Sequence, residues 1–193
     1  MIVEVGAWVL RQATLDRSRW FQHGLQAPRV AVNVSTVQLR REDFVRSLSQ
    51  VLRSAGSSAG LDIEVTESLI MDDADGNIAK LVAVRALGVG IAIDDFGTGY
   101  SSMGYLTRLP ATALKIDRSF IVAMLDDPGA MTLVSTIISL AHTLKIDVVA
   151  EGVESEEQAK MLRLLHCDEM QGYLMSRPLP FLEMQGYLER AVH

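Results

Sequence analysis

Two adjacent aspartates, Asp94 and Asp95, follow a short apolar run at 90–93 and precede a stretch that contains Gly97 and Gly99. Neighbouring carboxylates at the end of an apolar strand repel one another and lose hydration, so they are tolerable where a cation sits between them or where they stay in water. The glycines let the backbone approach a ligand closely or let the loop move. Aspartate and glycine are also ordinary turn residues, so this stretch alone leaves a surface turn open.

Polar residues also mark the ends of the other apolar runs. These are Asn33 in 29–35, Glu64 in 61–68, Lys115 and Asp117 in 113–117, Glu151 in 147–154 and Gln171 in 169–178. Apolar runs without two-residue alternation are typical of parallel strands buried on both faces. The sequence therefore predicts a parallel sheet with its polar groups near the C-terminal strand ends.

Helical patterns alternate with the predicted strands. They lie at 2–13, 42–55, 72–87, 128–144, 155–165 and 180–191. This α/β order fits an open doubly wound sheet or a (β/α)8 barrel, but an open sheet gathers its ligand groups at one switch point. Polar groups on nearly every strand favour a TIM-like (β/α) barrel. Because such a barrel has eight strands and about 250 residues, we expect the first two strands to be missing.

One amide and four carboxylates at these strand ends form a set of oxygen ligands, and we expect them to bind a hard divalent cation, Mg²⁺ or Mn²⁺. The set is Asn33, Glu64, Asp94, Asp95 and Glu151. Two ions bridged by Asp94 would activate water and hold phosphate oxygens. Glu151 would bind the second ion or take the proton of the water, and Lys115 would neutralise phosphoryl charge or orient the water. A structural ion pair between Lys115 and Asp117 is the alternative for that lysine.

Composition and charge limit the number of domains, the kind of partner and the cellular compartment that we expect for this chain. The chain has 193 residues, 49% hydrophobic and 22% charged, with no linker-like segment, and we expect residues 1–193 to form a single domain. The formal net charge of -6 argues against a DNA or RNA polymer as partner. One cysteine fits a reducing compartment, and we expect neither a signal peptide nor membrane contact from this segment.

Six segments carry a resemblance to a known family. They are AVNVS, IEVTES, IDDFGTGYSS, LKIDRSFI, VAEGVE and QGYLMSRP. In order and spacing they resemble the EAL family of cyclic-di-GMP (c-di-GMP) phosphodiesterases. The resemblance implies an EAL-type barrel with one antiparallel strand and bacterial second-messenger signalling in the cytoplasm. It also implies Mg²⁺- or Mn²⁺-dependent hydrolysis of c-di-GMP to linear pGpG, commonly by homodimers.

The resemblance also implies roles for individual residues. It implies that Asn33, Glu64 and Asp94 bind a first metal ion and that Asp95 and Glu151 bind a second. Glu151 would also be the general base, and Lys115 would contact the attacking water. Gln171 and Asp117 would bind substrate, and Glu67 would hold the loop that contains Gly97 and Gly99.

One family feature is missing, because no Glu-Ala-Leu tripeptide occurs in the sequence. In the family this tripeptide supplies a further metal ligand, so its loss should weaken the first metal site. We expect either a phosphodiesterase domain, with diguanylate cyclase or sensory domains in a longer parent, or an inactive c-di-GMP receptor or interaction module. A metal-dependent lyase of the enolase type also uses carboxylates and a lysine. The DDFGTGYSS and VAEGVE segments count against it.

Overall fold

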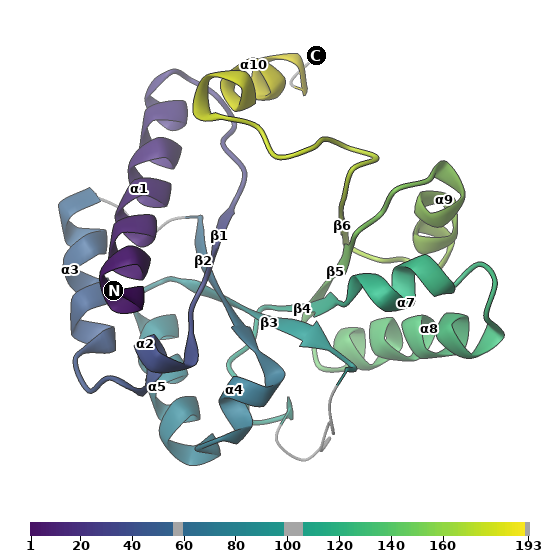
Figure 1. Cartoon of the computed structure of the whole chain (residues 1–193), viewed down its shortest axis with the longest axis horizontal. Helices are drawn as coiled ribbons and strands as arrows, with labels where there is room; N and C mark the ends of the chain where they lie inside the picture. The colour runs from purple at the N-terminus through teal and green to yellow at the C-terminus, as the bar shows by residue number, and fades with distance from the viewer. Residues whose placement is uncertain (56–59, 99–105, 192–193) are drawn as a thin grey trace. The chain divides into compact units, whose positions relative to one another are not determined.

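A computed structural model describes residues 1–55, 60–98 and 106–191, in which helices alternate with strands (Figure 1). The elements in chain order are α1 (Ile2–Gln22), β1 (Val30–Asn33), α2 (Thr36–Arg40), α3 (Phe44–Ala55), β2 (Leu61–Thr66), α4 (Glu67–Met71), α5 (Ala74–Ala86), β3 (Gly90–Phe96), β4 (Ala113–Ile116), α7 (Arg118–Ala123), α8 (Pro128–Thr143), β5 (Asp147–Glu151), α9 (Glu156–Leu164), β6 (Glu169–Gln171) and α10 (Phe181–Ala191). The predicted α/β class is confirmed.

The strands form one six-stranded sheet in the order β1-β2-β3-β4-β5-β6. The pairs β1–β2, β3–β4, β4–β5 and β5–β6 are parallel. Within each of these four pairs the strands therefore end at the same edge, and the register pairs Asn33 with Glu64 and Glu151 with Gln171.

Contacts divide the chain into two compact units. Unit 1 comprises Met1–Val65, Asp72–Ile91 and Pro178–His193, and unit 2 comprises Thr66–Met71 and Ala92–Arg177. Each unit buries its own apolar side chains, such as Ile63 and Leu81 in unit 1 and Leu114 and Val148 in unit 2.

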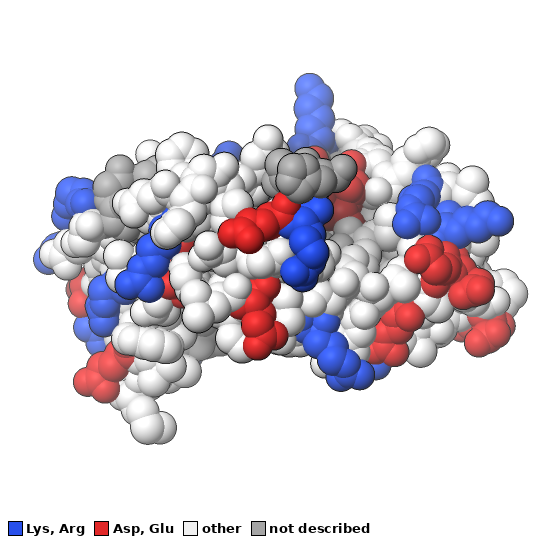
Figure 2. All heavy atoms as spheres, turned by 90° about the horizontal axis from the view of Figure 1, so that it is seen from above, with Lys and Arg blue, Asp and Glu red and all other residues white. Residues whose placement is uncertain are grey.

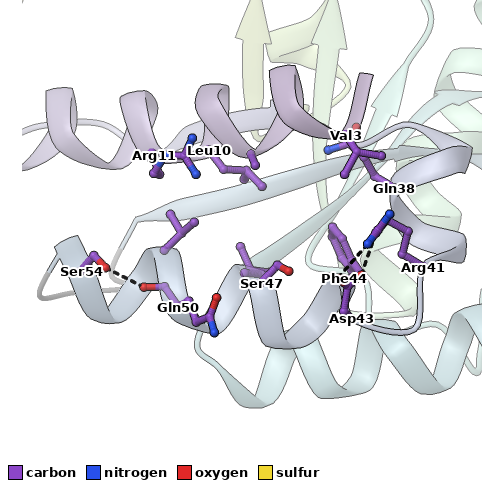
Figure 3. A pocket seen from close by; sticks show the side chains of 13 residues that line it. Val3, Leu10, Arg11, Gln38, Arg41, Asp43, Phe44, Ser47, Gln50 and Ser54 are labelled. Atoms are coloured by element: carbon purple, nitrogen blue, oxygen red, sulfur yellow. Dashed lines mark hydrogen bonds and ion pairs between the residues drawn. The ribbon is translucent and has the colours of Figure 1, made fainter. Parts of the chain in front are cut away.

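In unit 1, α1 and α3 lie side by side and border a pocket of about 370 Å³ (Figure 3). Val3 and Leu10 of α1 face Phe44 of α3 across this pocket. The helix α1 runs to Gln22, well beyond the predicted end at residue 13. Polar residues interrupt the apolar helical pattern in the second half of α1. Trp20 is nevertheless buried there and stacks on Phe181, with the two ring centroids 5.5 Å apart. This contact anchors the end of the helix.

Three short helices, α2, α4 and α7, were absent from the sequence prediction, and α2 and α7 begin at side-chain caps. Ser35 and Gln38 form a capping box at α2, and the Asp117 carboxylate accepts a hydrogen bond from the Ser119 N–H at α7. With five and six residues, they are too short to show helical periodicity. Ser155 and Gln158 form another capping box, at the start of α9.

Charged side chains of both signs are interspersed on the face seen in Figure 2. No described helix combines the length and the apolar character needed to cross a membrane.

Gly172, directly after β6, is predicted to tolerate no larger residue. A Cβ atom at this position would lie 2.1 Å from the Val153 carbonyl oxygen and 2.3 Å from its nitrogen, and backbone cannot move aside cheaply. We expect Gly172→Ala to lower the free energy of unfolding by about 1–3 kcal/mol, the usual cost of overpacking. Denaturant titration would measure this. Gly186→Ala is the control, since its Cβ would meet only Arg190 at 3.6 Å within α10, and we expect it to be neutral or stabilising. Equal stabilities for the two variants would contradict the close approach at Gly172.

A second prediction concerns Asp168, whose carboxylate lies 2.9 Å from Nε2 of His142 and accepts a hydrogen bond from the Val148 N–H at 2.8 Å. Burial by itself raises the pKa of Asp168, but these hydrogen bonds outweigh it and hold the pKa below its usual value. A carboxylate with a depressed folded pKa stabilises the protein above its unfolded pKa of about 3.9, and this stability is lost as the pH falls through the folded pKa.

We therefore expect Asp168→Asn to be less stable than the native chain at pH 6, and this difference in stability to shrink as the pH falls through the folded pKa of Asp168. Thermal unfolding across this range would measure the difference. Asp126→Asn, a change at an exposed position in the same unit, is the control. A stability difference that stays constant with pH would contradict the prediction.

Candidate metal centre

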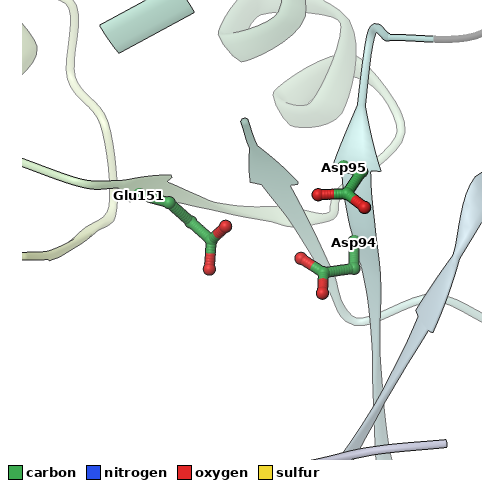
Figure 4. A group of neighbouring side chains, drawn as sticks. All are labelled: Asp94, Asp95 and Glu151. Carbon is green, nitrogen blue, oxygen red and sulfur yellow. The ribbon is translucent and has the colours of Figure 1, made fainter. Parts of the chain in front are cut away.

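Three carboxylates of unit 2 meet at the C-terminal ends of its strands. Asp94 and Asp95 belong to β3 and Glu151 is the last residue of β5 (Figure 4). One carboxylate oxygen from each lies within 4.8 Å of those from the other two. In Figure 4 the side chains of Asp94 and Glu151 point toward each other.

The convergence of Asp94 and Asp95 depends on an irregularity in β3. Successive side chains of a regular strand point to opposite faces, which would separate two adjacent aspartates. Here the register with β4 shifts between Ile93 and Phe96, and Asp95 has a φ of 54°. Aspartate tolerates this left-handed conformation better than most residues. The local bulge thus lets consecutive carboxylates serve one site.

Lys115 lies among these carboxylates. Its Nζ is 2.7 Å from Oε1 of Glu151 and 3.1 Å from Oδ1 of Asp94. The three side chains are only 5%, 20% and 13% exposed, respectively, so solvent screens these ion pairs much less than it screens surface pairs.

The carboxylates repel one another as well as attracting Lys115. The pKa of Asp95 is raised, first by burial and then by the negative charges of Asp94 and Asp117, while Lys115 acts in the opposite direction. This excess of negative charge favours binding of a further cation.

The donor set fits a hard divalent cation. All three side chains offer carboxylate oxygens, the ligands preferred by Mg²⁺ and Mn²⁺. Among the described residues, the buried Oδ1 of Asp94 accepts no hydrogen bond, although Nζ of Lys115 lies 3.1 Å away. An acceptor that is buried and lacks a hydrogen bond is available to a metal ion.

The other two predicted metal ligands belong to unit 1. Asn33 and Glu64 are register partners at the ends of β1 and β2, and the N–H of Val34 donates to the Glu64 carbonyl at 2.8 Å. Asn33 is exposed, whereas Glu64 is buried. The structure thus brings Asn33 to Glu64 within unit 1, and the three carboxylates together within unit 2.

Gln171 lies beside the carboxylate cluster. It pairs in register with Glu151, and both line a pocket of about 220 Å³ with Arg118, Glu154 and Tyr173.

The remaining predicted residues occupy varied positions. Asp117, expected to contact substrate, uses its carboxylate to cap α7 through the N–H and hydroxyl of Ser119. Glu67 begins α4 and is buried. Gly97 has a φ of 96°, which favours glycine, and Gly99 lies outside the described residues.

Arg118 was not among the residues singled out from the sequence. Its Nη2 lies 2.7 Å from Oε1 of Glu154, and its side chain lies so close to Gly152 that a Cβ there would be 2.3 Å from Cγ of Arg118. The glycine directly after Glu151 is the sequence signal that could have indicated this approach. None of the candidate residues lines the pocket of Figure 3.

Comparisons with known proteins identify close relatives. A sequence profile described as EAL domain matches residues 1–178. The chain is 45% identical over 181 residues to the bifunctional diguanylate cyclase/cyclic di-GMP phosphodiesterase MucR of Pseudomonas aeruginosa, covering 93% of this chain and 26% of MucR. It is 44% identical over 189 residues to the cyclic di-GMP phosphodiesterase NbdA of the same organism, covering 97% of this chain and 24% of NbdA. The chain therefore spans about a quarter of the length of these curated relatives.

Solved structures match as closely. The PaMucR phosphodiesterase in complex with c-di-GMP aligns with a TM-score of 0.91 at 43% identity, over 95% of this chain and 74% of that one. The EAL domain of Mycobacterium smegmatis DcpA aligns with a TM-score of 0.90 at 39% identity, over 97% of this chain and 85% of that one. The TIM-like barrel class predicted from the strand ends is that of these neighbours. By sequence profile, sequence identity and structure, the chain belongs to the EAL domain family.

Proposed function

We propose that this chain is a c-di-GMP phosphodiesterase domain that hydrolyses c-di-GMP to linear pGpG by a two-metal mechanism. The observation that carries the proposal is the cluster of Asp94, Asp95 and Glu151, with Lys115 bound to two of its members, in a chain of the EAL family. The relatives named as c-di-GMP phosphodiesterases support the choice of substrate.

In this reaction water adds to phosphorus, the bond from phosphorus to the 3′ oxygen breaks, and the leaving 3′ oxygen takes up a proton to become a hydroxyl. Bound Mg²⁺ or Mn²⁺ would lower the pKa of the attacking water and draw charge from the phosphate oxygens. Asp94, Asp95 and Glu151 would hold metal, and Asn33 and Glu64 are the further ligands that the family resemblance implies. Glu151 would also accept the proton of the water, and the Lys115 ammonium would stabilise negative charge on the phosphoryl group.

The proposal extends to the rest of the binding site and to the parent protein. Gln171 and Asp117 would contact the substrate, and Glu67 would hold the loop that includes Gly97 and Gly99. The family match runs through both compact units, which supports a single EAL-type domain. We further propose a homodimer in the bacterial cytoplasm and a longer parent with cyclase or sensory domains. The name of MucR describes a diguanylate cyclase and a phosphodiesterase combined in that protein.

Metal binding is the first test of this proposal. We expect millimolar Mg²⁺ or Mn²⁺ to raise the melting temperature, because a ligand at 100 times its Kd stabilises a protein by about 2.7 kcal/mol. Removal of the metal with EDTA should reverse the shift, and Asp94→Asn should abolish most of it. Glu156→Gln, at a 74% exposed position in the same unit, is the control and should respond as the native chain does. A native chain without a metal-dependent shift, or an Asp94→Asn variant with a full one, would contradict the assignment.

Turnover is the second test. We expect the native chain to produce pGpG from c-di-GMP with Mg²⁺ or Mn²⁺, and Glu151→Gln to lower kcat by about 10²–10⁴-fold, the usual contribution of a general base. Glu157→Gln, on the exposed part of the nearby helix α9, is the matched control and should keep the native rate. Chromatographic quantification of pGpG would measure both. Binding of c-di-GMP without turnover would reject the enzyme and leave a receptor.

A further inference from the structure

Lys115 is a buried cation on a buried strand. Its side chain is 5% exposed, and its neighbours in β4, Leu114 and Ile116, are fully buried. Burial penalises a charged ammonium strongly unless opposite charges compensate it. The contacts to Glu151 at 2.7 Å and to Asp94 at 3.1 Å provide that compensation.

The compensation is mutual, because the carboxylates need a cation as much as the lysine needs anions. Asp94, Asp95 and Glu151 bring oxygens to within 4.8 Å of one another. Carboxylates at this separation disfavour joint ionisation unless positive charge lies nearby. The ammonium of Lys115 supplies positive charge to two of the three.

We propose that Lys115 is the internal counter-ion of the metal-free site, and that metal binding loosens its ion pairs with Asp94 and Glu151. This inference rests on the proposed metal-dependent function. The oxygens that contact Nζ belong to the same carboxylates that would coordinate a metal ion. A divalent cation and an ammonium at one cluster also repel each other. Lys115 and the metal therefore compete for the same negative charge.

Competition predicts that removal of the lysine charge has opposite effects in the two states. Lys115→Met leaves the carboxylates without their counter-ion, so the metal-free protein should melt at a lower temperature. The same change removes a repelling charge from the metal site, so Mg²⁺ should bind more tightly, with a Kd lower by about tenfold or more. A lysine with a merely structural role would give the loss of stability without the gain in metal affinity.

The experiment compares the native chain, Lys115→Met and Lys80→Met. The Nζ of Lys80 donates to the carbonyls of Leu39 and Arg40 at 2.8 and 3.0 Å in unit 1, so its loss is structural and should leave the Kd for Mg²⁺ unchanged. Melting temperatures in EDTA and calorimetric titration with MgCl₂ are the measurements. A Kd for Mg²⁺ that stays equal or rises in Lys115→Met would overturn the proposal, as would failure of both the native chain and the variant to bind Mg²⁺.

A double variant keeps the proposal testable if Lys115→Met fails to fold. Lys115→Met/Glu151→Gln removes one carboxylate together with the lysine, so it should melt at a higher temperature in EDTA than Lys115→Met alone, or fold where that variant does not. A double variant no more stable than Lys115→Met would reject the counter-ion role.

Turnover distinguishes this inference from the proposed function. If Lys115→Met lowers stability and raises metal affinity while the native chain produces no pGpG, the counter-ion inference is supported and the phosphodiesterase is rejected. If the native chain produces pGpG while the Kd for Mg²⁺ is unchanged by Lys115→Met, the phosphodiesterase is supported and the counter-ion inference is rejected.

Discussion

The candidate site depends on the attraction between one buried ammonium and the carboxylates around it. Lys115 contacts Glu151 of the next strand and Asp94 of the preceding one, so two ion pairs link the ends of β3, β4 and β5. Ion pairs of this kind stabilise a site only if every charge keeps a partner, since removal of one member leaves the others buried and uncompensated. The arrangement is thus sensitive to any change that moves a single charge, including the arrival of a metal ion.

Parallel strand register places these charges. In the register of the sheet, Glu151 lies opposite Gln171 of β6, and Lys115 lies opposite Val149 of β5, two residues before Glu151. A slip of one residue would turn each side chain to the opposite face, but the fully buried Leu114, Ile116 and Val148 oppose that slip. Apolar packing along the strands therefore fixes the positions of the polar groups at their ends. The break in register at Asp95 is the exception, and it brings a second carboxylate to the cluster.

Much of this arrangement could be predicted from the sequence, because apolar runs with polar ends report both the strands and the edge at which they finish. Asp94, Asp95 and Glu151 were assigned to one site in this way. The function of Asp117 as a cap was not foreseen, because a carboxylate after a strand is equally compatible with a ligand contact and a helix start. The partners of Lys115 were also beyond reach, since its sequence neighbour Asp117 was the only pairing that spacing suggested. Contacts between strands distant in sequence decide such choices, and periodicity carries no information about them.

The number of protein ligands bears on the kind of metal site that this chain can form. Mg²⁺ prefers six oxygens in octahedral geometry and releases its waters reluctantly, so catalytic sites bind it through a few carboxylates and leave positions for water and phosphate. The unit 2 cluster offers three carboxylates, two of which, Asp94 and Glu151, are also paired with Lys115. A site of this composition would leave much of the coordination shell to solvent and substrate. That incompleteness suits hydrolysis of a phosphodiester better than permanent structural binding, in which protein ligands fill the shell and no position remains for the attacking water.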